Sequence, residues 1–431
     1  MFVMDCLEAK DNEIVIGGVK ISKLVRKYGT PLYVMDEMKI RENCRAYKDA
    51  LAKHYSGEAM VLYASKAFCC KRIYSIMKEE GLGADVMSGG ELYTAVLGDF
   101  PGNKVYFHGN NKSLEEIELA FEHGIHAFIA DNMPELDQIN MIAGEFGKKA
   151  NVLIRIKPGI EAHTHEFIKT GQIDSKFGVG LENGEADKVF EYTKKLKNLN
   201  ILGVHCHIGS QIFDTEPFCL AASRMMEFIA KVKKENNIEI TEFDIGGGCG
   251  IKYTQSDTPC SIEEYVKAIA KAVEAAAKKN KISLPKLIME PGRSIVGNAG
   301  ITIYTVGAVK DIQGVRKYVM VDGGMCDNPR YILYGSEYEA LRANKPQDGN
   351  LEMVTIAGKC CESGDILIKD AMLPHVETGD LIVVQATGAY NYSMASNYNR
   401  ITRPAVALVK DGDSKIIVMR ERYEDLARND R

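Results

Sequence analysis

Residues 104–130, KVYFHGNNKSLEEIELAFEHGIHAFIA, contain a complete strand–helix–strand unit. The runs 104–107 and 126–130 are short and apolar, which is typical of buried strands. Between them, residues 112–123 place apolar side chains at helical spacing. A helix between two such runs predicts parallel strands joined by a helical crossover.

The same alternation extends in both directions, from about residue 58 to residue 290. The other expected strands are 60–64, 83–86, 151–156, 201–207, 240–245 and 286–290, and residues 261–280 form another expected helix. Eight strands of this kind predict a (β/α)₈ TIM barrel. A doubly wound open sheet is the alternative that the pattern leaves open.

After residue 296 the pattern changes to short β-rich runs separated by Gly, Asp and Asn turns, which predicts an all-β domain. The expected strands are 302–309, 318–322, 352–357, 365–369, 381–386 and 405–410. Residues 14–21 also have a strand pattern and are expected to pair with this C-terminal sheet. The predicted domains are therefore a barrel over 31–295 and a β-domain made of 1–30 together with 296–431.

Composition narrows the class of protein. The 431 residues are 45% hydrophobic and 26% charged, with a net charge of -5 and no basic block that would neutralise a nucleic-acid backbone. No apolar run is long enough to span a bilayer. Eleven cysteines without a Cys-x-x-Cys pair or a secretory leader favour reduced thiols. We expect a soluble cytoplasmic protein that binds neither nucleic acid nor membrane.

Functional groups of a (β/α)₈ enzyme lie at the C-terminal ends of its strands. The glycines 246–248 follow the seventh strand and favour a phosphate site, although a tight turn would also need them. Lys66 follows the first strand, where we expect an amine shielded from water that is either a nucleophile or part of a salt bridge. Glu290 follows the eighth strand and is suited to a pyridine nitrogen. Together these three contacts indicate pyridoxal phosphate.

Nine motifs in the chain resemble those of the fold-type III pyridoxal-phosphate enzymes, and within them the diaminopimelate decarboxylase family. They are 63–67 (YASKA), 85–92 (DVMSGGEL), 175–178 (SKFG), 207–211 (HIGSQ), 246–251 (GGGCGI), 290–296 (EPGRSIV), 321–325 (VDGGM), 361–365 (CESGD) and 388–390 (GAY). The resemblance covers nearly the whole chain. It implies a barrel followed by a Greek-key β-domain, either a β-barrel or a β-sandwich.

The resemblance also implies a role for each matching residue. Lys66 would bind the cofactor covalently and His207 would stack on its ring, with Glu290 at the ring nitrogen. Further cofactor contacts would come from Asp85, Ser210, Gly246, Gly247, Gly248, Gly292, Arg293 and Tyr390. The substrate would meet Arg293, Arg330, Tyr334, Glu362 and Tyr390. Cys361 would act as a catalytic acid that reaches, with Glu362, into the site of a second subunit, which implies a homodimer with shared sites. Cys360 is adjacent, so the choice of thiol stays open.

The implied reaction is decarboxylation of meso-2,6-diaminopimelate to L-lysine and carbon dioxide, the last step of lysine biosynthesis, with no metal. Decarboxylation of ornithine, arginine or carboxynorspermidine is the nearest alternative. A metal-dependent hydrolase would instead use His205 and His207, with His163 and His165. A non-catalytic cofactor-binding protein is a third alternative. Three residues also have plainer interpretations, with Cys361 a core filler, Tyr390 a core aromatic and Arg330 half of a surface ion pair.

Overall fold

The computed structural model describes residues 2–160, 175–346 and 349–431 and divides the chain into two compact units. The barrel unit comprises Cys44–Gly250 and Pro259–Gly292. The sheet unit comprises Met1–Asn43, Ile251–Thr258 and Arg293–Arg431. The segments 31–43 and 251–258, which the strand pattern assigned to the barrel, thus belong to the sheet unit.

Eight parallel strands form the barrel, and they pair in the order of the sequence. They are β5 (Ala59–Ala64), β6 (Gly83–Val86), β7 (Val105–Phe107), β8 (Ala127–Ala130), β9 (Ala150–Lys157), β11 (Leu199–His205), β12 (Glu242–Asp244) and β13 (Lys286–Met289). The ring closes where β13 pairs with β5, with Met289 opposite Val61. All eight expected strands are confirmed, and the open sheet is wrong because both edges are joined.

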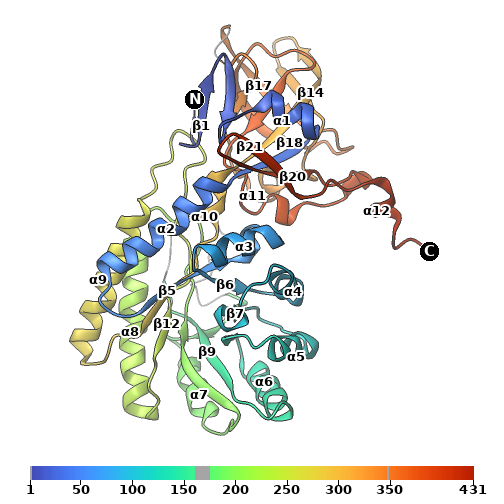
Figure 1. The fold of residues 1–431 in the computed structure, drawn as a ribbon. Coiled ribbons are helices and arrows are strands. Elements are labelled where there is room, and N and C mark those ends of the chain that lie inside the picture. Colours follow the sequence, from blue (N-terminus) through green and yellow to red (C-terminus); the bar gives the residue numbers. More distant parts are fainter. Residues whose placement is uncertain (1, 161–174, 347–348) are drawn as a thin grey trace. The chain divides into compact units, whose positions relative to one another are not determined.

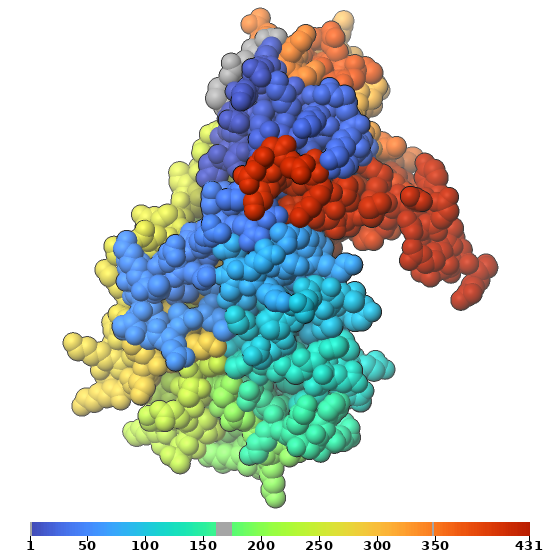
Figure 2. All heavy atoms as spheres, viewed as in Figure 1, coloured from blue at the N-terminus to red at the C-terminus, as the bar shows by residue number. Residues whose placement is uncertain are grey.

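Helices follow the strands around the outside of the barrel (Figure 1). They are α3 (Lys71–Glu79), α4 (Gly89–Leu97), α5 (Leu114–Glu122), α6 (Met133–Glu145), α7 (Glu185–Thr193), α8 (Glu216–Asn236) and α9 (Ile262–Asn280), and short β10 (Val179–Gly180) pairs with β9. In the space-filling view the colours of the barrel segments follow one another from blue through cyan to green (Figure 2). Both α5 and α9 begin at a serine capping box, which satisfies backbone N–H groups of the first turn.

Apolar side chains fill the interior of the ring. Leu62, Tyr106, Leu153 and Ile288 are fully buried in one cluster. The phenol of Tyr106 donates a hydrogen bond of 2.9 Å to Glu242, so its polar end is satisfied despite burial. The barrel is therefore a packed core, and polar chemistry is confined to the strand ends.

The sheet unit is built mainly from the C-terminal strands. They are β14 (Gly300–Ile312), β15 (Arg316–Val321), β16 (Ala340–Arg342), β17 (Leu351–Ala357), β18 (Ile366–Pro374), β19 (Leu381–Val384), β20 (Ala405–Lys410) and β21 (Asp413–Val418). Every strand expected after residue 296 is present. One N-terminal strand, β4 (Leu32–Asp36), lies between β14 and β20, which explains why this segment belongs to the sheet unit.

The expected pairing of residues 14–21 with the C-terminal sheet is wrong. These residues form β2 (Glu13–Ile16) and β3 (Val19–Lys20), which pair with each other and with β1 (Leu7–Lys10) in a separate three-stranded sheet. Gly17 and Gly18 have φ angles of 55° and 76°, so they turn the chain back at once and β3 takes the place of a distant partner. Among the described residues, an isolated bridge from Glu13 to Asn344 and a backbone hydrogen bond from the Gly412 N–H to the Gly17 carbonyl at 2.9 Å connect this small sheet with the C-terminal segment.

The remaining helices either precede the first barrel strand in the sequence or are only four or five residues long. They are α1 (Ile21–Tyr28), α2 (Glu37–His54), α10 (Arg293–Val296), α11 (Arg330–Tyr334) and α12 (Tyr423–Ala427), with 3₁₀ turns at η1 (Ser65–Ala67), η2 (Gly102–Lys104), η4 (Gly297–Ala299), η5 (Tyr392–Met394) and η6 (Tyr398–Arg400). Among the described helices, none is both long enough and apolar enough to cross a membrane.

Strand β14 offers a matched test of the sheet-unit core. Ile303 is fully buried between Leu32 and Val383, whereas Ile312 on the same strand is 38% exposed. Ile303→Ala should lower the free energy of unfolding by about 2–5 kcal/mol, because a cavity is left in the core. Ile312→Ala should change it by less than about 0.5 kcal/mol. Urea unfolding of both variants checks this, and equal losses would contradict the assigned core.

Candidate active site

Polar side chains gather at the C-terminal ends of the barrel strands, on the rim where barrel enzymes place their chemistry. Lys66 follows β5, Asp85 lies in β6, and His205 ends β11. Glu290 follows β13 directly. Because neighbouring strands are parallel and in register, these residues share one end of the barrel although they come from distant parts of the sequence.

Lys66 lies in the 3₁₀ turn η1, with Ser65 and Ala67 buried on either side of it. Its own side chain is exposed, so the expectation of an amine shielded from water is wrong for the single chain. Within the described residues Lys66 makes no salt bridge, which removes the structural alternative for this lysine. An amine without an ion-pair partner is available for covalent chemistry.

The glycines after β12 form a cradle. Gly246 and Gly248 have φ angles of 75° and 127°, which side-chain-bearing residues rarely adopt. A Cβ on Gly248 would lie 2.6 Å from the carbonyl oxygen of Gly209. A Cβ on Gly247 would collide with the carbonyl oxygen of Glu290. The backbone therefore needs glycine at these positions both for its conformation and for its close packing.

His207 lies against this cradle. The backbone N–H of Gly247 donates to Nδ1 of His207 at 3.3 Å, so the ring accepts at Nδ1. Burial and the nearby charge of Lys66 hold the pKa of His207 well below its usual value. The ring is therefore a neutral aromatic surface. Ser210 is half-buried. A Cβ added at Gly292 would lie 3.0 Å from the Cβ of Ala64, so glycine allows the loop after β13 to pack closely there.

Glu290 is buried between two imidazoles. Its Oε1 lies 2.7 Å from Nε2 of His108, and its Oε2 lies 3.3 Å from Nε2 of His205. Burial acts to raise the pKa of Glu290, but the two histidines outweigh it and hold that pKa well below the usual range. Oε1 still lacks an aligned hydrogen-bond donor among the described residues, so it can accept one more.

Two more carboxyl groups lie beside Glu290. Burial raises the pKa of Asp85, whose Oδ1 lies 3.6 Å from Nε2 of His108. Burial and the charge of Glu290 raise the pKa of Asp244 well above its usual value. Glu290 is thus the carboxyl group of the three that the surroundings keep ionised.

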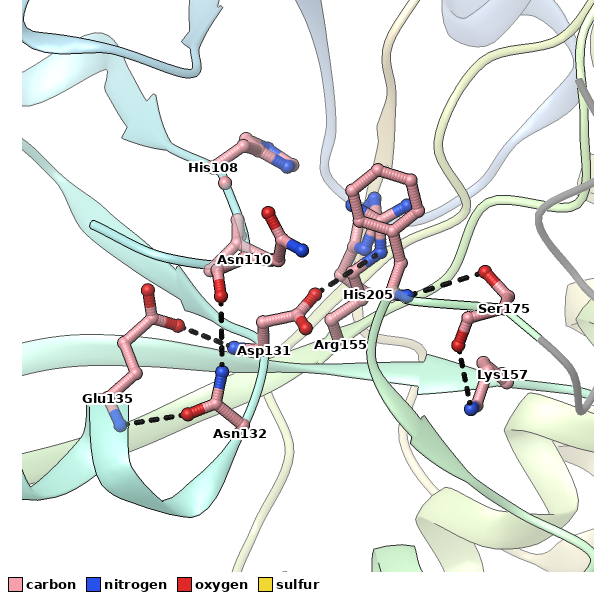
Figure 3. A network of polar contacts seen from close by, with 12 residues as sticks. His108, Asn110, Asp131, Asn132, Glu135, Arg155, Lys157, Ser175 and His205 are labelled. Carbon is pink, nitrogen blue, oxygen red and sulfur yellow. Dashed lines mark hydrogen bonds and ion pairs between the residues drawn. The ribbon is translucent and has the colours of Figure 1, made fainter. Parts of the chain in front are cut away.

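Arg155 on β9 is a cation of this rim that sequence patterns did not single out. Its guanidinium faces Asp131, with Nε 3.9 Å from Oδ1 (Figure 3). The same group lies 4.4 Å from the ring centroid of Phe177. Phe177 belongs to the SKFG motif at 175–178, where Lys157 Nζ donates to the carbonyl of Ser175. Because Arg155 is a single polar residue inside a strand and belongs to none of the motifs, the sequence did not indicate that it lies at the site.

The metal-site alternative finds little support in this geometry. Among the described residues, one group has its ligand atoms within 4.8 Å of one another, and it is His108, His205 and Glu290 without His207. The 2.7 Å contact between His108 and Glu290 is shorter than the roughly 3.3 Å that separates two ligands held 2.0–2.1 Å from one tetrahedral ion. His163 and His165 lie outside the described residues.

In the sheet unit, Arg293 and Arg330 share a phenol. Nη1 of Arg293 donates to the Tyr253 hydroxyl at 2.6 Å, and Nη1 of Arg330 donates to the same oxygen at 3.2 Å and to the Tyr338 hydroxyl at 2.9 Å. Burial acts to raise the pKa of Tyr253, but the two guanidinium charges outweigh burial and lower that pKa. Both arginines are buried, so the surface ion pair considered for Arg330 is wrong. Two buried guanidinium groups beside phenols suit a carboxylate.

Tyr390 and Tyr334 lie close to the same pair of arginines. The ring of Tyr390 lies 4.8 Å from the guanidinium of Arg293 and 5.6 Å from that of Arg330. Tyr390 has a φ of 69° and is half-buried, which does not suit a plain core aromatic. Tyr334 lies 5.8 Å from Arg330, at the end of α11. Sequence patterns did not identify Tyr253 and Tyr338 as partners of the two arginines.

The two adjacent cysteines have different surroundings. Cys360 is buried, and its N–H donates to Asp365 at 2.7 Å. Cys361 is an exposed free thiol whose N–H donates to Asn399 at 2.7 Å, and Glu362 beside it is also exposed. Cys361 is therefore the accessible thiol and is no core filler.

The barrel rim fits pyridoxal phosphate. The loop Gly246–Gly248 has a backbone path that side chains would block, His207 offers a neutral ring, and the buried Oε1 of Glu290 can accept a hydrogen bond. The unpaired amine of Lys66 completes the contacts that the cofactor requires.

Comparison with known proteins agrees with this site. Residues 37–297 match the family model described as the pyridoxal-binding domain of pyridoxal-dependent decarboxylases. The chain is thus a pyridoxal-phosphate-dependent decarboxylase on a (β/α)₈ barrel. It is 49% identical over 416 residues to a diaminopimelate decarboxylase of Bacillus subtilis, covering 96% of this chain and 94% of that protein. The chain belongs to the diaminopimelate decarboxylase family.

Two further proteins extend the comparison. The diaminopimelate decarboxylase of Bacillus methanolicus is 50% identical over 406 residues, covering 94% of each chain. The crystal structure of diaminopimelate decarboxylase from M. jannaschii in complex with L-lysine aligns with a TM-score of 0.94 at 38% identity, covering 100% of this chain and 99% of that one. The similarity therefore extends over both units.

The glycine cradle can be tested with two glycines of positive φ. Gly248→Ala places a Cβ 2.6 Å from the Gly209 oxygen and should weaken cofactor binding by about tenfold or more, because overpacking displaces the cradle. Gly314 also has positive φ, at 70°, but nothing lies within 4 Å of its Cβ position, so Gly314→Ala is the control. Titration of cofactor-free protein with pyridoxal phosphate measures both affinities. Unchanged affinity for Gly248→Ala would contradict the assignment.

Proposed function

We propose that this enzyme decarboxylates meso-2,6-diaminopimelate to L-lysine and carbon dioxide, the last step of lysine biosynthesis. The observation that carries the proposal is the pair formed by the unpaired amine of Lys66 and the ionised carboxylate of Glu290 on adjacent barrel strands. The M. jannaschii relative, crystallised with L-lysine, supports the choice of product.

Pyridoxal phosphate supplies an aldehyde that condenses with amines and a protonated ring that accepts the electrons left when carbon dioxide departs. Lys66 would hold the cofactor through its side-chain amine. Glu290 would keep the ring nitrogen protonated, because an ionised carboxylate stabilises a proton there. His207 would cover one face of the ring.

The phosphate group calls for many N–H and O–H donors and for close approach of the backbone. We assign it to the cradle Gly246–Gly248, to Ser210 and to Tyr390, with Gly292 and Asp85 completing the pocket walls. Backbone N–H groups in such a turn bind an anion without needing a cation.

Substrate recognition falls to Arg293, Arg330 and Tyr334. Diaminopimelate has a second amino-acid end, and its carboxylate matches the forked donors of a guanidinium group. Tyr253 holds both arginines close together through its hydroxyl oxygen. Substrates without the distal carboxylate cannot form the charge-assisted contact with these guanidinium groups, which selects against ornithine and arginine.

Cys361 and Glu362 of one subunit act in the site of the other in a homodimer. Cys361 Sγ delivers the proton that replaces the lost carboxylate on Cα, and Glu362 contacts the distal ammonium group of the substrate. Both side chains are exposed in the single chain, as residues that serve a second subunit should be. The eleven cysteines are free thiols, which supports a reducing, cytoplasmic setting.

Lys66→Ala should abolish carbon dioxide release and the visible absorption of covalently bound cofactor, because no other amine replaces Lys66. Borohydride reduction of the wild-type holoprotein should fix the label on the peptide that contains Lys66. Lys71→Ala, an exposed lysine at the start of α3, serves as the control and should retain both properties. Faster carbon dioxide release from ornithine than from meso-diaminopimelate would contradict the substrate.

Shared sites can be tested by mixing inactive variants. Lys66→Ala and Cys361→Ala should each be inactive, yet mixing them in equal amounts should restore about a quarter of wild-type activity, since half of the dimers then contain one intact site of two. Refolded mixtures assayed for carbon dioxide release provide the measurement. Mixtures as inactive as the separate variants would show that Cys361 serves its own chain.

A further inference from the structure

Two histidines of the barrel rim have no part in the mechanism above. His108 follows β7 and is 5% exposed, and His205 ends β11 and is 1% exposed. Burying an imidazole costs free energy unless its nitrogens find partners. In both residues Nε2 is directed at Glu290, with one ring beside each carboxylate oxygen. Figure 3 shows both histidines in the polar network that also contains Arg155 and Asp131.

We propose that His108 and His205 are positioning residues, which clamp the Glu290 carboxylate between them so that it stays ionised and presents Oε1 to the ring nitrogen of the cofactor. The inference rests on the proposed role of Glu290 and deepens it. Both histidines act through Glu290 and not on the substrate.

The clamp has a definite geometry. The two rings meet edge to face, with centroids 5.0 Å apart and an angle of 79° between them, so they approach the carboxylate from different directions. His205 is hydrogen-bonded to Oε2 at 3.3 Å. His108 lies 2.7 Å from Oε1 without hydrogen-bond alignment, which leaves Oε1 able to accept from another donor. Of the two carboxylate oxygens of Glu290, Oε1 is therefore the one that can accept a further hydrogen bond.

The protonation states follow from burial. Burial lowers the pKa of His205 to about 4, so the ring is neutral at neutral pH. A carboxylate is an acceptor only, so the neutral ring must carry its hydrogen on the Nε2 that faces Glu290. Nδ1 of His205 has no hydrogen-bond partner among the described residues and does not compete for that hydrogen.

Without the clamp, the surroundings would favour neutral Glu290. The charged and titratable groups that act on it come from all sides of the rim and are Asp85, His108, Arg155, His205, Cys206, His207 and Asp244. Asp85 and Asp244 oppose its charge, as does burial. Asp244 is also buried, but among the described residues no ion pair joins it to an imidazole, and burial and the charge of Glu290 raise its pKa well above the usual value. The histidines thus select which carboxyl group is ionised.

The experiment removes or preserves one N–H donor at a time. His108→Leu and His205→Leu remove it, whereas His108→Gln and His205→Gln keep an amide N–H near the position of Nε2. The Leu variants should lower kcat roughly 10- to 100-fold with KM nearly unchanged, the loss expected when a polar partner of a buried charged group is removed. The Gln variants should recover most of that loss.

A second readout does not depend on turnover. The absorption spectrum of the bound cofactor should change with pH as Glu290 is protonated. In the Leu variants this change should occur at higher pH than in the wild type, because losing the imidazoles raises the pKa of Glu290. His126 is the matched control, since its Nε2 lies 2.9 Å from Glu242, outside the site. His126→Leu and His126→Gln should keep the wild-type spectrum and kcat.

The outcomes separate this inference from the function on which it rests. If Glu290→Gln keeps full kcat, the role proposed for Glu290 is wrong. If Glu290→Gln loses activity while both Leu variants keep the wild-type kcat and spectral pH dependence, the clamp is refuted. Should a Leu variant fail to fold, the Gln variant of the same histidine is measured instead. If that Gln variant, which keeps an N–H near Glu290, loses as much kcat as Glu290→Gln does, the proposal is overturned.

Discussion

The pairing of β13 with β5 is the constraint on which the rest of the site depends. Three register pairs, from Leu287 opposite Ala59 to Met289 opposite Val61, turn a row of parallel strands into a ring. The contact continues beyond the strands, where the N–H of Ala64 donates to the carbonyl of Pro291 at 3.2 Å. Lys66 and Glu290, which are far apart in the sequence, thereby follow neighbouring strands. Without closure they would lie at opposite edges of a sheet.

Each of the two units buries charged side chains that water cannot reach, so neighbouring side chains or a bound ligand must stabilise the charge. In the barrel unit, Glu290 stays ionised because imidazoles compensate its burial. In the sheet unit, Arg293 and Arg330 are buried beside phenols that accept their hydrogen bonds but carry little charge. Such preorganised charge is costly in the folded protein and useful in catalysis, since less reorganisation is needed when substrate and cofactor bind. The cost is met by the apolar cores of the two units.

Sequence patterns located the strands well and their partners less well. The expected runs agree with the eight barrel strands and with the later sheet strands because a strand end is set by local alternation and turn residues. Residues 14–21 show the limit. Their strand character was predicted, but Gly17 and Gly18 decided the partner by turning the chain back on itself. Lys66 shows a similar limit, because its position was predicted but its exposure was not.

The sequence by itself determined the order of strands and helices, the lysine, the glycine cradle and the acidic residue at the end of the last strand. It also pointed to the decarboxylase family through motifs that need no coordinates. Only the tertiary structure decided that His108 and His205 meet Glu290, that Arg293 and Arg330 share Tyr253, and that Cys360 is buried while Cys361 is exposed. The reason is physical, since periodicity reports which face of its own element a residue occupies. Which distant side chain it meets, and in what dielectric, depends on strand register and on closure between segments that are far apart in the sequence.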